Sequence, residues 1–463
     1  MDFSGNICAI ATAPGGAIGI IRVSGPDSVT ITNKMFKGVG GKTLAEAKPY
    51  TLSFGQIVDE QEGIVDEVLV SVFHAPHSYT GENSVEISCH GSAYILQRIM
   101  QLLLQHGCRT ANPGEFTQRA FLNGKMDLSQ AEAVADLIAS NSASTHRMAM
   151  SQMRGGFSRE LSQLRDRLLH LTSLMELELD FSDHEELEFA DRTELHQLAH
   201  EIEKVIGNLA QSFRLGNAIK NGFPVAIVGE TNAGKSTLLN ALLHEERAIV
   251  SDIHGTTRDV IEDTVNLGGI TFRFIDTAGI RETTDTIESL GIERSFQKME
   301  QAQIVLWMVD SQHAAEQVNN LSDQILPLCV DKKLIVVVNK ADLMAGAPLS
   351  HLPDFPENVD VVFISAKEKL GLEQLQNRLI SVAQVPEVGE EDVVVSNIRH
   401  YEALTNAQAA IHRVVDGMNQ GLPGDLISQD LRECLFHLAE IVGGEVTTDE
   451  VLGNIFKNFC IGK

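Results

Sequence analysis

The chain has 463 residues, of which 43% are hydrophobic, and its formal net charge at pH 7 is −27. This length and composition exclude disorder on a large scale and predict about three globular units, because one hydrophobic core rarely grows to this size. The negative charge excludes a broad basic surface for nucleic acid or anionic lipid, although it remains compatible with a local basic groove.

Residues 1–121 mix short apolar segments with Gly and Pro, which is typical of a small α+β domain. Alternating apolar positions predict strands over residues 18–23 and 68–73, and helical periodicity predicts a helix over residues 94–106. We therefore expect an N-terminal domain that combines a sheet with at least one covering helix.

Long amphipathic helices follow, which predicts the first part of a helical domain over residues 122–217. Residues 176–194 are crowded with carboxylates, and we expect a solvated acidic turn there rather than a metal site. The apolar positions of the two predicted helix faces are Leu161, Leu164, Leu168, Leu171 and Met175 on one, and Leu195, Leu198, Ile202, Val205 and Leu209 on the other.

Residues 218–384 alternate strand-like runs with helical stretches, which predicts a doubly wound α/β domain. Helical periodicity returns over residues 403–415 and 427–441, so residues 385–463 are predicted to complete the helical domain. The expected fold is thus multidomain, with an α/β domain inserted into a helical bundle built from both flanks. The predicted strands of the α/β domain are residues 225–228, 272–275, 304–309, 334–338 and 361–364.

A P-loop follows the first strand of the α/β domain. The run GETNAGKS at residues 229–236 lies between a strand and a helix, and this context distinguishes a P-loop from an ordinary Gly-rich turn. Its backbone N–H groups and the helix N-terminus would face phosphate, Lys235 would reach the terminal phosphates, and Ser236 would supply a hydroxyl ligand for Mg²⁺. The predicted nucleotide contacts here are Asn232, Ala233, Gly234, Lys235, Ser236 and Thr237.

Three further motifs end predicted strands, and together with the P-loop they predict GTP as the ligand. Asp276 can hold Mg²⁺ through water, and the N–H of Gly279 can sense the terminal phosphate. Asp342 can accept both hydrogens that guanine presents at N1 and at its exocyclic amino group, and adenine presents neither there. Each motif alone could be an ordinary strand-end loop. The predicted contacts are Asp276, Thr277, Ala278, Gly279, Asn339, Lys340, Asp342, Ser365, Ala366 and Lys367.

A Gly/Thr-rich loop, residues 255–259, lies between the P-loop and Asp276 and suits ordering by a γ-phosphate and its metal. We choose Thr257 as the second hydroxyl ligand of Mg²⁺, against the alternative of an ordinary polar turn. Ile280 stands where a water-orienting Gln is expected, so hydrolysis needs a water positioned from elsewhere and a further positive charge. Glu288 is the nearest carboxylate candidate, although its position also fits a solvent-facing helix residue.

Several segments outside the GTPase motifs are absent from generic GTPases. They are IGIIRVSG at residues 18–25, SYTGE at 78–82, PGEF at 113–116, FLNGK at 121–125 and FCIGK at 459–463. On these segments the chain resembles the MnmE (TrmE) family of tRNA-modification GTPases over essentially its whole length. The resemblance implies a homodimer formed through N-terminal domains that resemble folate-binding modules, with GTPase domains that meet during hydrolysis.

The resemblance also implies K⁺ as the activating charge, in the role that an arginine finger plays in other GTPases. Glu288 matches the residue that orients the attacking water, which accounts for Ile280, and the implied catalytic set is Glu288, Asn232 and Lys235. The matched K⁺ ligands are Asn232, Ser251, Ile253 and Thr256. The same loop adds Ser251, Asp252, Ile253, His254, Gly255 and Thr256 to the expected GTP contacts.

The family's folate contacts match Arg22, Glu86, Lys125 and Lys463, although each alone reads as a surface charge or ion pair. The implied cofactor is a tetrahydrofolate that carries a one-carbon unit, as formyl or methylene. That unit would reach position 5 of the wobble uridine of certain tRNAs as part of an aminomethyl or carboxymethylaminomethyl group. MnmG, a flavin-dependent partner expected to carry FAD, would complete the reaction in a hetero-oligomer.

The six cysteines lack CxxC and Cys/His metal spacing, which indicates a reducing compartment without structural zinc. The first residues lack a signal peptide's basic and apolar parts, and no apolar run is long enough to cross a bilayer, so we expect a cytoplasmic protein without membrane attachment. Gly462 and Lys463 argue against prenylation of Cys460. For that thiol, a catalytic role and a packing role both stay open.

The acidic balance predicts weak tRNA binding by this chain alone, because phosphate contacts normally depend on Lys and Arg. We expect the partner protein to tighten that binding. The rival function is a GTP-switch ribosome-assembly factor, which would share all the GTPase motifs but would not require tetrahydrofolate. The folate-like segments and the absence of a basic GxxG-type RNA module favour the tRNA-modification function.

Overall fold

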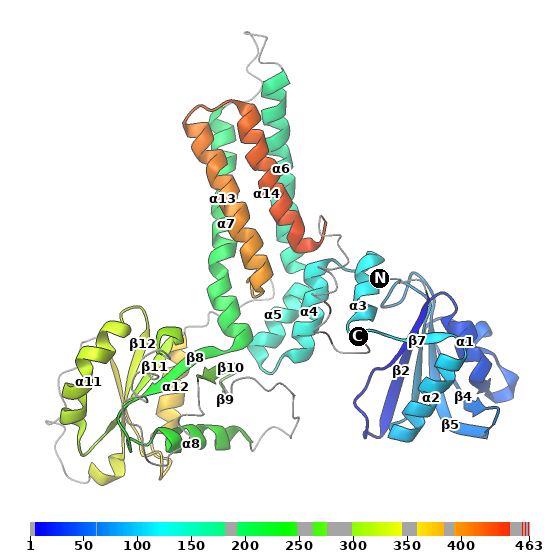
Figure 1. Cartoon of the computed structure of the whole chain (residues 1–463), viewed down its shortest axis with the longest axis horizontal. Coiled ribbons are helices and arrows are strands. Elements are labelled where there is room, and N and C mark those ends of the chain that lie inside the picture. The colour runs from blue at the N-terminus through cyan, green and yellow to red at the C-terminus, as the bar shows by residue number, and fades with distance from the viewer. Residues whose placement is uncertain are drawn as a thin grey trace. The chain divides into compact units, whose positions relative to one another are not determined.

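The computed structural model divides the chain into two compact units (Figure 1). One unit contains Met1–Ala139, Ala149–Gly207 and Glu402–Lys463, and the other contains Ser140–Met148 and Asn208–Tyr401, so the second is inserted in sequence between parts of the first. The finer division at residues 121, 217 and 384 stays a prediction. The described residues are 5–61, 63–180, 192–247, 263–275, 299–344, 359–383, 393–444, 456, 459 and 462.

A seven-stranded sheet forms the N-terminal part of the first unit. Its elements are β1 (Asn6–Ile10), β2 (Ile18–Ser24), α1 (Ser28–Met35), β3 (Phe36–Gly38), β4 (Leu52–Asp59), β5 (Gly63–Phe73), β6 (Ser84–His90), α2 (Ala93–Gln105) and β7 (Cys108–Thr110), with short 3₁₀ turns at Val39–Gly41 and Leu44–Glu46. The strand order is β3-β4-β5-β6-β2-β1-β7, and only the β1–β7 pair is parallel. The strands predicted over residues 18–23 and 68–73 and the helix predicted over residues 94–106 are confirmed.

The two faces of this sheet differ in character. Helices α1 and α2 pack on one face, where alternate strand residues such as Ile21, Val70 and Ile87 are fully buried. The opposite face exposes apolar side chains: Phe54 on β4 and Leu69 on β5 are directly paired across the strands and are 51% and 42% exposed. An apolar sheet face of this kind favours contact with another molecule.

Long helices form the rest of the first unit, and α14 packs along α6 (Figure 1). All five apolar positions predicted on the face of residues 161–175 are buried. In the next long helix, residues 192–221, the buried face differs from the predicted one at two positions. Leu198 and Val205 are only half-buried, whereas the residues that follow them, Ala199 and Ile206, are buried. These helices are α3 (Glu115–Leu122), α4 (Leu128–Ala139), α6 (Gly156–Asp180) and α14 (Gly424–Val442). Three more helices, α5 (Ala143–Met153), α7 (Arg192–Asn221) and α13 (Ile398–Asn419), belong partly to the first unit and partly to the second.

The second unit is built on a six-stranded sheet with helices on both faces. Its elements are β8 (Phe223–Val228), α8 (Lys235–Arg247), β9 (Asp263–Leu267), β10 (Ile270–Phe274), β11 (Ile304–Asp310), α11 (Ala314–Leu328), β12 (Lys333–Asn339), a 3₁₀ turn (Ala341–Met344), β13 (Asp360–Phe363) and α12 (Leu372–Ala383). The order is β13-β12-β11-β8-β10-β9, parallel except for β9, so the doubly wound prediction is confirmed. The antiparallel edge strand β9 was not predicted.

Burial explains why the central strands of this sheet were easy to predict. Every residue of β8 and β11 is buried, as expected for parallel strands covered on both faces. In β9 only Val265 and Leu267 are buried, and its polar neighbours hide the pattern. Among the described residues, no helix is long and apolar enough to span a bilayer.

Candidate functional site

Three of the predicted nucleotide motifs meet at one edge of the second unit's sheet. The P-loop follows β8, the NKAD motif begins at the end of β12, and the SAK motif follows β13. Parallel strands present their carboxyl ends at the same edge, which is where open α/β sheets bind ligands. Asn339 joins all three motifs, because its Nδ2 donates to Ala233 O (2.8 Å) and its Oδ1 accepts from Ala366 N (3.0 Å).

Glycine is required where the P-loop approaches its neighbours. Gly229 and Gly234 have φ of +144° and +98°, conformations that favour glycine. A Cβ atom would lie 2.2 Å from Met308 O at position 229 and 2.2 Å from Asn339 Nδ2 at position 234. The loop then enters α8 at Lys235, so the N-terminus of a helix faces the space that the loop encloses. This backbone cradle fits a phosphate chain.

Lys235 is already held inside the loop. Its Nζ donates to the carbonyl oxygens of Gly229 and Glu230, both at 2.7 Å. Burial lowers the pKa of this ammonium, and the nearby Glu230 carboxylate partly opposes the shift. A buried cation held by neutral carbonyls gains from an anionic ligand, so this environment favours phosphate binding.

The NKAD loop rests on an ion pair that the sequence did not indicate. Lys340 has a left-handed φ of 61°, and its Nζ lies 2.6 Å from Oδ2 of Asp310 at the end of β11. Burial alone would raise the pKa of Asp310, but bonds from Lys340 and from the amide of Gln312 outweigh it and lower the pKa. The available signal was a carboxylate that ends an apolar strand. Asp342 follows in the 3₁₀ turn and is exposed.

Replacing Asn339 by alanine should weaken nucleotide binding at least tenfold and lower the melting temperature of the nucleotide-free protein. The carbonyl of Ala233 and the amide of Ala366 would both lose their partner in a buried position, and each unpaired group costs about 1–3 kcal/mol. Calorimetric titration with GDP and thermal unfolding measure the two effects. Asn320→Ala is the matched control, because among the described residues that exposed side chain bonds only to the side chain of Glu230. Equal behaviour of both variants would contradict the bridging role.

Besides the nucleotide motifs, the predicted site residues form a second cluster, which contains Arg22 and Glu86. It lies on the N-terminal seven-stranded sheet, on the face opposite α1 and α2. The two residues are directly paired between β2 and β6, and Arg22 Nε and Nη2 donate to Glu86 Oε1 at 3.0 and 2.8 Å. The rings of Tyr79 and Phe116 lie 5.4 and 5.6 Å from the guanidinium carbon. Gly462 O accepts from Arg22 Nη1 at 3.2 Å, which brings Gly462 to this cluster. Sequence reasoning missed both rings, although each lies in a segment that carried the family resemblance.

A buried charge network supports this cluster. Glu115, the first residue of α3, is fully buried and binds Arg109 in bidentate fashion and Arg119 one turn further along the helix. Arg119 is 1% exposed and also binds both carboxylate oxygens of Glu82. Phe116 is adjacent to Glu115, so the network fixes the ring that stacks on Arg22.

Of the remaining predicted residues, Lys125 is the one folate contact that the structure describes besides Arg22 and Glu86. Lys125 is exposed and donates to Pro76 O at 3.0 Å, and no bond between it and Arg22 or Glu86 is present among the described residues. The other predictions lie outside the described residues: Ser251–Thr257, Asp276–Gly279, Glu288, Cys460 and Lys463. Ser236 and Asn232 are thus the described members of the predicted Mg²⁺ and K⁺ ligand sets, at the start of α8 and in the P-loop.

Comparisons with known proteins match the whole chain. The family model described as MnmE helical domain matches residues 128–460, and the model described as GTP-binding protein TrmE N-terminus matches residues 6–125. A protein of Bacteroides thetaiotaomicron named tRNA modification GTPase MnmE is 66% identical over 463 residues and covers 99% of each chain. Proteins with the same name from Bacteroides fragilis (strain YCH46) and Flavobacterium johnsoniae are 65% and 53% identical, again covering 99% of each chain.

Proposed function

The chain belongs to the MnmE family of tRNA modification GTPases, and on this premise we propose how its two clusters serve that activity. It is a GTP hydrolase of tRNA modification, and the single observation that carries the nucleotide site is the Asn339 bridge between the P-loop and both base-binding motifs. This bridge couples the phosphate cradle to the guanine pocket, so that base recognition and phosphate binding support each other. The ribosome-assembly alternative is set aside.

In the proposed GTP complex, the amides around Gly234 and the start of α8 hold the phosphates, and Lys235 exchanges its carbonyl partners for phosphate oxygens. The carboxylate of Asp342 accepts the two guanine hydrogens. Mg²⁺ and K⁺, when bound, would supply positive charge where negative charge develops on the phosphates. Ser236 would hold Mg²⁺ with Thr257, and Asn232 would hold K⁺ with Ser251, Ile253 and Thr256. Glu288 would orient the attacking water.

The Arg22 cluster is the proposed one-carbon site, in which a tetrahydrofolate derivative binds. Both hydrogen bonds that Glu86 receives from Arg22 go to Oε1, and among the described residues Oε2 makes no hydrogen bond. Oε2 is therefore available to accept the donors of a pterin, while Lys125 and Lys463 would serve the carboxylates of the folate tail. Tyr79 and Phe116 hold the guanidinium in place by cation–π contact.

The proposed homodimer would form through the exposed face of the N-terminal sheet, the face on which the Arg22 cluster lies. Phe54, Leu69 and Leu52 lie on the face that also carries Arg22 and Glu86, and Leu52 is 65% exposed. Contact between two copies here would bury these side chains and enclose the one-carbon site. The hydrophobic gain of burying each such side chain is about 1.5–3 kcal/mol.

The proposed reaction installs an aminomethyl or carboxymethylaminomethyl group at position 5 of wobble uridine, together with the FAD-containing partner MnmG, in the cytoplasm. GTP hydrolysis would drive a conformational cycle rather than the bond chemistry. The domain division proposed for this cycle is 1–121, 122–217, 218–384 and 385–463. With a net charge of −27, the chain alone would bind tRNA weakly.

Replacing Arg22 by leucine tests the one-carbon site. We expect tetrahydrofolate affinity to fall at least tenfold with GTP turnover unchanged, because a charge-assisted hydrogen bond contributes about 1.5–3 kcal/mol and Glu86 would lose its partner. Equilibrium dialysis with 5-formyltetrahydrofolate measures the affinity, and Lys34→Gln on α1 is the control that removes an exposed cation from the same unit. Unchanged folate affinity in Arg22→Leu would place the cofactor elsewhere and leave the GTPase assignment intact.

A further inference from the structure

The hairpin of β9 and β10 is held at its turn by the start of α5 and the residues just before that helix, and these bonds have no role in the account above. Ser144 Oγ donates to Gly269 O at 2.8 Å, in the turn itself. Asn141 bonds to both strands, because its carbonyl accepts from Asn266 Nδ2 at 3.2 Å and its Oδ1 accepts from Thr271 Oγ1 at 3.3 Å. All of these residues belong to the second unit.

The cap of α5 fixes the residues that hold the turn. Ser142 precedes the helix, and its Oγ accepts from the amide of Thr145 at 3.2 Å, while Thr145 Oγ1 accepts from the amide of Ser142 at 3.1 Å. These reciprocal bonds form a capping box in which Thr takes the place of the usual Glu. Ser142, Ser144 and Thr145 are each at most 9% exposed although they are polar. The bond from Ser144 to the turn is therefore made by a side chain that the helix start holds in place.

The hairpin is suited to carry a displacement along its length. Gly268 and Gly269 form its two-residue turn with φ of +58° and +80°, and positive φ at both positions is typical of the type I′ turn, which fits the twist of paired strands. β9 is an edge strand in which only Val265 and Leu267 are buried, so it is held less firmly than the central strands. We therefore expect the two strands and their turn to move together.

The turn lies at the edge of the sheet opposite to the nucleotide motifs. β10 runs parallel to β8, and Phe272 near the start of β10 pairs with Phe223, the first residue of β8. The turn is therefore at the amino edge, whereas the P-loop follows β8 at the carboxyl edge. In the sequence, β9 follows the loop that contains Thr257, and β10 leads to Asp276, and both residues are predicted to hold Mg²⁺. The hairpin thus connects the chain next to the predicted metal ligands with Asn141 and Ser144.

Helix α5 extends from this contact into the other unit. Its residues up to Met148 belong to the second unit, and those from Ala149 onward belong to the first. At its last residue, Met153 O accepts from Gln130 Nε2 of α4 at 3.1 Å. One helix is therefore bonded to the hairpin at its start and to α4 at its end.

We propose that Asn141 and Ser144 transmit the nucleotide state from the β9–β10 hairpin to α5. GTP with its Mg²⁺ orders loops that contact the γ-phosphate, and hydrolysis releases them, so the hairpin between these loops differs in position between the two states. Because Asn141 and Ser144 bond the hairpin at its other end, α5 follows this difference. The proposal rests on the conformational cycle proposed above and names the element that transmits it. A contact that only stabilises the fold is the competing explanation.

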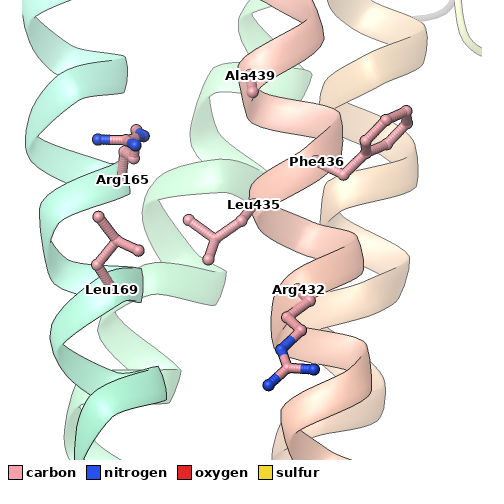
Figure 2. Close-up of a pocket in the computed structure, with 6 residues that line it drawn as sticks. All are labelled: Arg165, Leu169, Arg432, Leu435, Phe436 and Ala439. Carbon is pink, nitrogen blue, oxygen red and sulfur yellow. The ribbon is translucent and has the colours of Figure 1, made fainter. Parts of the chain in front are cut away.

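Hydrogen exchange of the α5 amides tests this transmission directly. In wild type, exchange over residues 143–153 should differ at least about threefold between the complexes with GDP and with guanylyl imidodiphosphate, a non-hydrolysable GTP analogue. The double variant N141A/S144A should lose this difference, because the hairpin then moves without α5. Amides of α14 are the internal reference and should exchange equally in both complexes. This helix packs along α6 in the first unit, where Leu169 and Leu435 point toward each other (Figure 2).

Enzyme activity separates transmission from a purely structural role. In N141A/S144A, kcat and KM for GTP should stay within about twofold of wild type, because both residues bond at the sheet edge opposite to the P-loop. Wobble-uridine modification in a deletion strain complemented with this variant should fall at least about tenfold.

The matched control is N221A/S381A, which removes the same two types of side chain from exposed positions of the second unit, where each bonds within its own helix. It should leave GTP turnover, modification and the exchange difference unchanged. Circular dichroism and the melting temperature show that each variant is folded. If the double variant is unfolded, Ser144→Ala, which removes one buried hydroxyl, is used for the same measurements.

Equal exchange of α5 in the two wild-type complexes would overturn the proposal. A difference that persists in N141A/S144A, or that is as large in α14 as in α5, would overturn it as well. Complementation separates this failure from that of the proposed function. If wild type and N141A/S144A restore modified wobble uridines equally, the transmission proposal alone fails, whereas failure of wild type to restore them contradicts the proposed function.

Discussion

Replacing Asp342 by asparagine should lower GTP affinity at least about 100-fold and create activity toward XTP. The carboxylate is the group proposed to accept both guanine hydrogens, and hydrogen bonds to a charged group contribute about 1.5–3 kcal/mol each. Xanthine carries a carbonyl in place of the exocyclic amino group, and an asparagine amide can donate to that carbonyl. Steady-state hydrolysis of GTP and XTP by wild type and Asp342→Asn measures the switch.

The gain of XTP activity makes this prediction specific, because a misfolded variant would lose activity toward both nucleotides. Lys367→Gln is a useful comparison, since its side chain is 86% exposed and the SAK motif is predicted to act through backbone donors. An Asp342→Asn variant that hydrolyses GTP as well as wild type would show that guanine is recognised elsewhere.

Replacing Arg119 by methionine should destabilise the N-terminal sheet by about 3–5 kcal/mol, the usual cost of breaking a buried ion pair by removing one partner. Arg119 is 1% exposed and joins Glu115 to Glu82, so its loss leaves carboxylates without compensation. Hydrogen exchange of β1, β2 and α3 amides measures the local stability. Arg413→Met is the matched control, because this exposed arginine also pairs with two carboxylates and should contribute less than about 1 kcal/mol.

The same network gives a pH dependence. Burial alone would raise the pKa of Glu115, but hydrogen bonds from Arg109, the Asn112 amide and Arg119 outweigh it, so the pKa lies below its ordinary value. A depressed folded-state pKa stabilises the fold fully above the unfolded pKa of about 4.3, and this contribution is lost as pH falls below that value. Glu115→Gln should flatten the loss of stability on acidification below about pH 4.3. An equally steep loss in that variant would exclude Glu115 as its source.

Much of the fold could be predicted because its signals are local. The five strand runs of the α/β domain and the stripe from Leu161 to Met175 needed only periodicity and burial. The difference between the predicted and the buried face of α7 was not predictable, because Ala199 is small enough to look neutral in the pattern and neighbouring helices decide which side faces inward. Strand β9 was missed for the related reason that an edge strand buries few residues.

The candidate site also has parts that the sequence predicts and parts that only the folded structure reveals. Motif spacing predicted that the P-loop, NKAD and SAK motifs meet at one sheet edge, because parallel strands end together. The Asp310–Lys340 pair depends on β11 lying beside β12, which spacing does not give. The bond from Arg22 to Gly462 joins opposite ends of the chain, so only the folded structure reveals it.

Mass spectrometry of nucleosides from total tRNA tests the central claim most directly. The comparison uses a strain that lacks the gene and the same strain complemented with wild type or with Lys235→Ala. The account predicts that aminomethyl-type wobble uridines disappear on deletion, return with wild type, and stay absent with Lys235→Ala, because the modification depends on GTP held in the P-loop. A nucleoside profile unchanged by deletion would contradict the assignment to tRNA modification.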